Sequence, residues 1–110
     1  MDLSEYQTET SRTAIFPDEL PESVDAGVVY CALGLAGEAG EVAEKIKKAV
    51  REDDPDYLED LEDELGDVAW YWAQLATQLG LDASDVAERN LAKLADRQER
   101  GALTGEGDDR

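Results

Sequence analysis

Hydrophobic and polar positions follow a helical period along most of the chain, and no stretch of useful length alternates as a β-strand does. A first helix is expected over about residues 3–13. A loop through "FPDELP" follows, because Pro17 and Pro21 interrupt regular structure. The second helix is expected from about residue 22 to residue 51. The pattern therefore predicts an all-α fold.

The second and third helices carry long apolar stripes and are expected to pack as an antiparallel hairpin. Asp54-Pro55 indicates an N-cap with proline at the first position of the third helix, which should reach Leu79 before Gly80 ends it. The stripe of the second helix comprises Val24, Val28, Cys31, Leu35, Val42 and Ile46. The stripe of the third comprises Leu58, Leu61, Leu65, Val68, Trp72, Leu75 and Leu79.

A fourth helix is expected from a cap at Asp82 to about Arg100, where Gly101 closes it. The remaining tail, "ALTGEGDDR", is polar and expected to be disordered. We therefore assign one domain to residues 1–101 and an acidic tail to residues 102–110. Wide apolar stripes in a chain of 110 residues predict a helical bundle completed by self-association, as a homodimer or a homotetramer.

The charge balance narrows the functional classes. The chain has 28 acidic and 10 basic residues and a formal net charge of −18, which argues against binding to nucleic acid or to a membrane surface. It has neither a run of about 18 apolar residues nor the order of an export signal at its start, so a cytoplasmic location is expected. The many acids and few lysines resemble a halophilic composition. With one cysteine and no histidine, any metal would be held by oxygen.

Four acids stand out by position, in the pairs Glu38/Glu41 and Glu64/Asp67. At about 100° per residue, each pair lies roughly 60–130° to the same side of the apolar stripe of its helix. Two antiparallel helices packed stripe to stripe preserve this sense of rotation, so the two pairs should face one another. Both also lie at similar distances from a turn near Asp53. The four carboxylates are therefore predicted to meet at one level of the hairpin.

Four such charges would repel one another strongly, and a hard divalent cation would relieve the repulsion. Mg²⁺ prefers carboxylate oxygens together with water and substrate phosphates. The residues Gly37, Gly40 and Gly66 lie beside the acids and would let a helix, a metal or a phosphate chain approach closely. Tight helix packing alone is the other interpretation of these glycines.

Eight of the ten basic residues form two clusters, which suggests sites for an anion, although salt bridges to neighbouring helices are an equal alternative. One cluster comprises Lys45, Lys47, Lys48 and Arg51, and the other comprises Arg89, Lys93, Arg97 and Arg100.

The stretches "GLAGEAGEVAEKIKK" and "EDELGDVAWYW" resemble the MazG-type all-α nucleoside triphosphate pyrophosphohydrolases, and the resemblance extends from "EYQ" to "RNLAKLADR". It implies a four-helix MazG-like bundle that is oligomeric, with substrate pockets between subunits. It also implies that Glu38, Glu41, Glu64 and Asp67 are the catalytic metal ligands. They would bind Mg²⁺, with Mn²⁺ as a substitute, for the hydrolysis of a nucleoside triphosphate to its monophosphate and pyrophosphate.

The same resemblance assigns substrate contacts. Asn90 and Lys93 match an Asn-x-x-Lys pattern that would contact the phosphate chain together with Arg97, one turn on. Tyr71 would contact the sugar or a phosphate, or else lie at the edge of the core. Lys45 would pair with a phosphate or neutralise Glu41.

Trp70 and Trp72 are candidates for stacking on the base, although Trp72 lies in the apolar stripe and is favoured as a core residue. House-cleaning of non-canonical nucleotides is the role that the resemblance suggests. Two alternatives remain open. One is an enzyme like the phosphoribosyl-ATP pyrophosphohydrolases, and the other is a non-enzymatic acidic helical dimer that binds a cation or a basic partner.

Overall fold

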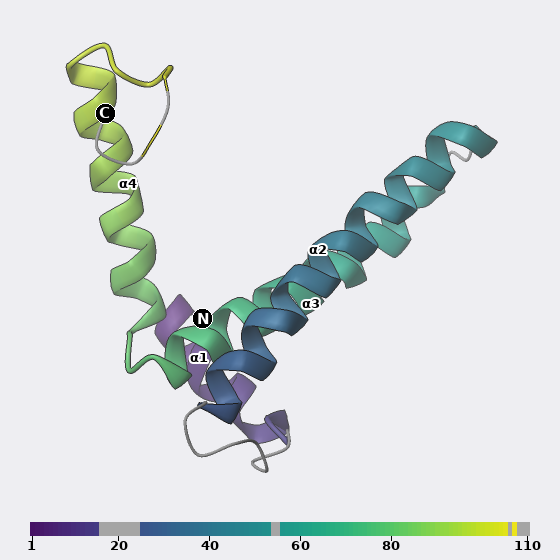
Figure 1. Ribbon diagram of the computed structural model, residues 1–110, viewed down its shortest axis with the longest axis horizontal. Coiled ribbons are helices and arrows are strands. Elements are labelled where there is room, and N and C mark those ends of the chain that lie inside the picture. Colours follow the sequence, from purple (N-terminus) through teal and green to yellow (C-terminus); the bar gives the residue numbers. More distant parts are fainter. Residues whose placement is uncertain (16–24, 54–55, 106, 108–110) are drawn as a thin grey trace.

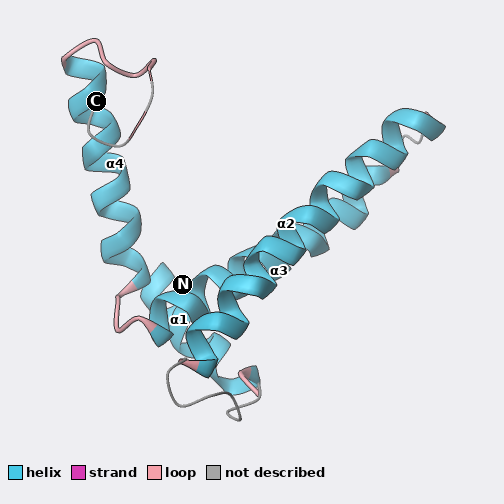
Figure 2. Cartoon of the chain, in the orientation of Figure 1, coloured by secondary structure: helices cyan, strands magenta, loops and turns pink. Residues whose placement is uncertain are grey.

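The computed structural model describes residues 1–15, 25–53, 56–105 and 107, and within these ranges the regular structure is entirely helical (Figure 2). In the described ranges, four α-helices and one short 3₁₀ turn follow one another (Figure 1). The all-α, four-helix fold predicted from the sequence is thus confirmed. The elements are α1 (Leu3–Thr10), η1 (Ser11–Thr13), α2 (Ala26–Glu52), α3 (Tyr57–Gln78) and α4 (Ala83–Glu99).

The first two helices differ from expectation at their ends. The predicted helix over residues 3–13 is α-helical only to Thr10, and its last turn tightens into η1. The second helix begins at Ala26, because the Asp25 side chain accepts a hydrogen bond from the Val28 amide at 3.1 Å and so caps it. The expected start near residue 22 and the "FPDELP" loop lie outside the described residues.

The last two helices follow their predicted caps more closely. The proposed start at Asp54-Pro55 lies outside the described residues, and the structure has Asp56 at the N-cap position of α3, where its side chain does not cap the helix. Asp82 caps α4 as predicted, since its side chain accepts from the Asp85 amide. Gly80 and Gly101 adopt φ angles of 72° and 69°, a left-handed conformation that ends each helix at low cost.

Helices α2 and α3 form a long antiparallel hairpin (Figure 1). Its turn begins at Asp53, the C-cap of α2, whose φ of 51° reverses the chain direction in the left-handed region. Cys31 on α2 and Leu61 on α3 are buried along the seam. Both positions belong to the predicted stripes, along which the two helices pack. Three other stripe residues stay exposed in the single chain, namely Ile46 (42%), Leu65 (58%) and Leu79 (54%).

Helix α1 is fastened to the opposite end of the hairpin by the buried side chain of Gln7. Its Nε2 donates to the Leu81 carbonyl at 2.8 Å and to Thr77 Oγ1 at 2.9 Å, and its Oε1 accepts from the Ala83 amide at 2.8 Å. Gln74, also buried, donates from α3 to Thr10 Oγ1 at 2.8 Å. Gln74 also donates to Ser11 Oγ at 3.1 Å, so η1 is held against α3.

Helix α4 projects away from the α2–α3 hairpin and makes its main contacts with α1 and with the end of α3 (Figure 1). Large apolar side chains remain exposed on both parts, including Leu33 (69%), Val50 (79%) and Leu65 (58%) on the hairpin and Leu91 (67%) on α4. Helix α2 has the length and the mean hydropathy, 1.2 over 18 residues, of a membrane-crossing helix, with 11% of that window buried. The isolated chain therefore leaves much apolar surface uncovered.

Candidate functional site

Three of the four predicted carboxylates meet on one side of the hairpin. Oxygens of Glu38 from α2 and of Glu64 and Asp67 from α3 all lie within 4.8 Å of one another. Glu38 and Glu64 are half-buried, whereas Asp67 is exposed. The donor set fits a hard divalent cation such as Mg²⁺ or Mn²⁺, because it offers only carboxylate oxygens and is open to water on one side.

The fourth predicted carboxylate, Glu41, is exposed and does not belong to this group. Three residues along a helix rotate a side chain by about 60°, so Glu41 lies farther round α2 from the apolar seam than Glu38 does. The predicted level of the acids along the hairpin is therefore observed, but the rotation separates Glu41 from the other three.

The surroundings of Glu38 and Glu64 shift the pKa values of the two carboxyls in opposite directions. Burial raises the pKa of Glu38 above its ordinary value, and a hydrogen bond to Glu64 and the negative charge of Asp67 raise it further. A hydrogen bond from the Lys45 ammonium lowers the pKa of Glu64, and a hydrogen bond with Glu38 adds to this effect. Of the two carboxyls, Glu38 therefore holds its proton more readily than Glu64 does.

Lys45 reaches across the hairpin from α2 to α3. Its Nζ lies 2.8 Å from Glu64 Oε1. This bond raises the pKa of Lys45, so the side chain stays charged. The ion pair of Lys45 is thus with Glu64, while Glu41 adds a weaker charge interaction with the same ammonium.

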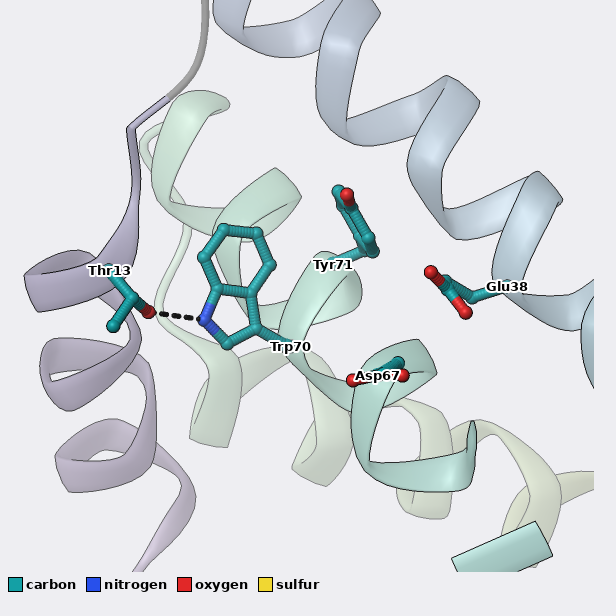
Figure 3. A pocket seen from close by; sticks show the side chains of 5 residues that line it. All are labelled: Thr13, Glu38, Asp67, Trp70 and Tyr71. Atoms are coloured by element: carbon teal, nitrogen blue, oxygen red, sulfur yellow. Dashed lines mark hydrogen bonds between the residues drawn. The ribbon is translucent and has the colours of Figure 1, made fainter. Parts of the chain in front are cut away.

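A pocket of about 300 Å³ opens beside the acid cluster (Figure 3). Glu38 and Asp67 line one side of it, and the aromatic rings of Trp70 and Tyr71 line another. The two rings meet edge to face with centroids 5.0 Å apart. Thr13 of η1 completes the wall and accepts a hydrogen bond from Trp70 Nε1 at 2.8 Å. The cluster thus adjoins a space with both polar and aromatic walls.

Tyr71 owes its position to Gly34. A Cβ atom at Gly34 would collide with the Tyr71 ring, so only glycine lets this ring pack against α2. Tyr71 also stacks at a tilt on Tyr30, with ring centroids 6.3 Å apart. Tyr71 therefore packs against the hairpin, as one of its two interpretations had it, and also lines the pocket.

The glycines beside the acids have no such neighbour. A Cβ at Gly37, Gly40 or Gly66 would have nothing within 4 Å among the described atoms of this chain. Tight packing within one chain, one of the two interpretations of these glycines, is therefore not observed.

The predicted contacts from the fourth helix are not brought to the acid cluster within one chain. Asn90 lines a separate pocket with Trp72, so Trp72 lies at the α4 side and not beside the acids. Lys93 is half-buried and Arg97 is buried, both on the helix that projects away from the hairpin (Figure 1). Thr13 was not predicted from the sequence, because nothing in "SRT" indicates that η1 packs against Trp70, which lies 57 positions later in the chain.

Comparisons with known proteins agree with this geometry. The family model described as "MazG nucleotide pyrophosphohydrolase domain" matches residues 30–101, which include the acid cluster, the aromatic pair and α4 but leave out α1 and η1. The chain is 46% identical to Gene 37 protein of Mycobacterium phage L5 over 114 aligned residues, covering 100% of both chains. No solved structure gives a significant match. The chain belongs to the MazG nucleotide pyrophosphohydrolase family.

Proposed function

We propose that this protein is a Mg²⁺-dependent nucleoside triphosphate pyrophosphohydrolase that converts a ribo- or deoxyribonucleoside triphosphate to the monophosphate and pyrophosphate. The observation that carries the proposal is the juxtaposition of three carboxylates within 4.8 Å of one another and an aromatic-walled pocket lined by two of them. Family membership supplies the reaction class. The pocket supplies a place for the nucleoside beside the place for the phosphates.

Each part of the site has a distinct role in this proposal. Glu38, Glu64 and Asp67 would hold the cation, and Glu41, three residues along α2 from Glu38, would be a further ligand. When bound, the cation neutralises the phosphate oxygens and activates the water that attacks the α-phosphorus. Trp70, held in place by Thr13, offers its ring face to the base, and Tyr71 bounds the sugar.

The phosphate-binding side chains of α4 would come from a second copy of the chain. Helix α4 carries Asn90, Lys93 and Arg97 but projects away from the α2–α3 hairpin, which carries the acid cluster (Figure 1). On a helical projection, the exposed Ile46 and Val50 lie about 140–180° from Glu41, on the flank of α2 away from the acids. A second copy packed on this apolar flank would form a homodimer or a dimer of dimers.

A membrane is a poorer partner for the same surface. Helix α2 passes a test of length and hydropathy for a membrane span. However, Glu38 and Glu41 lie in the middle of it, where carboxylates inside a bilayer are costly. We therefore propose a cytoplasmic oligomer with no membrane or nucleic-acid partner.

Two other functions would use the same cluster differently. A relative of the phosphoribosyl-ATP pyrophosphohydrolases would act at the same kind of anhydride on a larger substrate. A non-enzymatic dimer would use the acids to bind a cation or a basic partner. The aromatic pocket beside the acids favours the nucleotide enzymes over the binding protein, because a cation or a basic helix does not need a stacking surface.

The proposal is tested by incubating the purified protein with Mg²⁺ or Mn²⁺ and a panel of canonical and modified nucleoside triphosphates. Phosphoribosyl-ATP is included as a separate member of the panel. Several salt concentrations are needed, because screening affects a chain with a net charge of −18. Release of pyrophosphate from a nucleoside triphosphate supports the proposal, whereas no turnover of any member at any salt concentration contradicts it.

A further inference from the structure

The ion pair between Lys45 and Glu64 differs in kind from other ion pairs of the hairpin. It joins α2 to α3, with exposed fractions of 33% for the lysine side chain and 14% for the glutamate side chain. The pair between Lys47 and Glu44 lies within α2 and is far more exposed, at 66% and 46%. The Lys45 pair is therefore placed where solvent screens it less.

This ion pair also occupies part of the proposed cation site. Glu64 belongs to the carboxylate cluster, and the Lys45 ammonium lies 2.8 Å from its Oε1. Asp60 and Glu41 add further negative charge around the ammonium. A divalent cation that coordinates Glu64 would lie close to the Lys45 ammonium, which is bound to the same carboxylate. The two positive charges would repel each other.

We propose that Lys45 is a built-in counter-cation of the carboxylate cluster, which a divalent cation displaces from Glu64 and which then contacts the phosphate chain of the substrate. This inference rests on the proposed function and adds a coupling to it. Lys45 weakens the binding of the metal alone and strengthens the binding of the phosphate chain once the metal is present. The site would thus load metal and nucleotide together in preference to metal alone.

The coupling predicts opposite effects of one substitution. Lys45→Met keeps most of the aliphatic stem but removes the charge. Without any phosphate ligand, this variant should bind Mn²⁺ about three- to tenfold more tightly than the wild type, because the repulsion of a unit charge near the site is lost. With Mn²⁺ saturating, it should bind inorganic pyrophosphate about three- to tenfold more weakly, because one ammonium donor is lost.

The measurement is a titration followed by electron paramagnetic resonance for free Mn²⁺ and by calorimetry for pyrophosphate, on the full chain. Lys47→Met is the matched control, since it removes the same charge from the same helix but from an exposed pair with Glu44. Both affinities of the control should stay within about twofold of the wild type. Lys45→Gln is the second variant if Lys45→Met does not fold, as judged by circular dichroism, and the same shifts are expected of it.

The outcomes separate this inference from the function on which it rests. If the wild type does not bind Mn²⁺, the proposed metal site fails and this inference fails with it. If the wild type binds Mn²⁺ but the Lys45 variants bind it no more tightly, only the counter-cation role is overturned. If the Mn²⁺ affinity rises while the pyrophosphate affinity is unchanged, displacement is supported and the transfer of Lys45 to the phosphate chain is overturned.

Discussion

The α2–α3 hairpin and helix α4 carry the two halves of the proposed site, and only the first half is assembled within one chain. The hairpin brings Glu38, Glu64 and Asp67 within 4.8 Å of one another. Helix α4 carries the candidate phosphate contacts on an arm that packs mainly on α1 and on the end of α3 (Figure 1).

The difference teaches how each half is specified. The hairpin depends on one apolar stripe along each of its helices, of 27 and 22 residues, and on one short turn between them. These are local features of the sequence. The position of α4 relative to the acids depends on surfaces that a single chain leaves exposed, among them Leu65 on the hairpin and Leu91 on α4. The metal site should therefore form within a single chain, whereas the phosphate contacts of α4 should form only when chains assemble.

The largest effect is expected from the acids of the hairpin. Glu38→Gln and Glu64→Gln should each lower turnover by more than about 100-fold. Loss of a residue that only supports a metal ligand costs up to about 100-fold, and loss of a ligand itself should cost more. Initial rates of pyrophosphate release at saturating Mg²⁺ measure this loss.

The matched controls are Glu59→Gln and Glu62→Gln, which have the same spacing but are exposed and lie outside the cluster. They should keep activity within about twofold of the wild type, as surface substitutions usually do. Equal losses in the controls and the cluster would show that general acidity matters and that the facing-pair geometry does not.

A mixing experiment tests directly whether α4 of one chain acts on the acid cluster of another chain. Glu64→Gln and Lys93→Met should each be inactive alone, but unfolding and refolding them together should restore about a quarter of the wild-type activity. Half of the dimers in such a mixture are mixed, and each mixed dimer would have one intact site if α4 acts on the partner's acids. Activity that stays at the level of the single variants would show that each site lies within one chain.

A pair of glycine substitutions distinguishes packing inside the hairpin from open surface beside the acids. Gly34→Ala should destabilise the protein by about 1–3 kcal/mol, because its Cβ would displace the Tyr71 ring. Gly37→Ala has open space and should stabilise the helix by about 0.5–1 kcal/mol. Urea unfolding of the metal-free protein measures both changes, and equal signs would refute the assigned contact between Gly34 and Tyr71.

The smallest effect concerns the metal-free stability of the acid cluster. Since the folded protein raises the pKa of Glu38 above 4.5, the stability gained from its proton is full below that pH and is lost as pH rises through the raised value. Glu38→Gln should therefore melt a few degrees higher than the wild type at pH 7, and the difference should vanish at acidic pH.

Glu64→Gln should behave in the opposite way at pH 7. Its folded pKa is lowered, chiefly by Lys45, so its charge stabilises the fold above pH 4.5, and this contribution is lost as pH falls through the lowered value. Thermal unfolding across this pH range, with a chelator present, measures both variants. Stabilisation of the metal-free protein by both substitutions would contradict the ion pair with Lys45.

Much of this architecture could be predicted from the sequence because it rests on local signals. Asp82 and Gly101 bound α4 through capping chemistry, and the seam of the hairpin follows helical periodicity. The level of the acids followed from counting residues outward from Asp53. These features depend on a few neighbouring residues, so the physics of one helix or one turn decides them.

The remaining features depend on contacts between distant parts of the chain. Thr13 reaches Trp70 only because Gln7 and Gln74 hold α1 and η1 in place, and no periodicity in the sequence indicates that network. Lys45 was expected either to contact a phosphate or to neutralise Glu41, and its ion pair across the hairpin with Glu64 was not expected. Which of several nearby acids a lysine pairs with depends on the three-dimensional packing of the two helices, and the sequence alone does not specify it.

The central claim is that water attacks the α-phosphorus of a nucleoside triphosphate at the acid cluster of the hairpin. Its most direct test is hydrolysis of a turned-over nucleotide in ¹⁸O-labelled water with Mg²⁺, followed by mass spectrometry of the products. The account predicts labelled nucleoside monophosphate together with unlabelled pyrophosphate, and no products when a chelator removes the cation. A nucleoside diphosphate with inorganic phosphate, or label in the pyrophosphate, would contradict it.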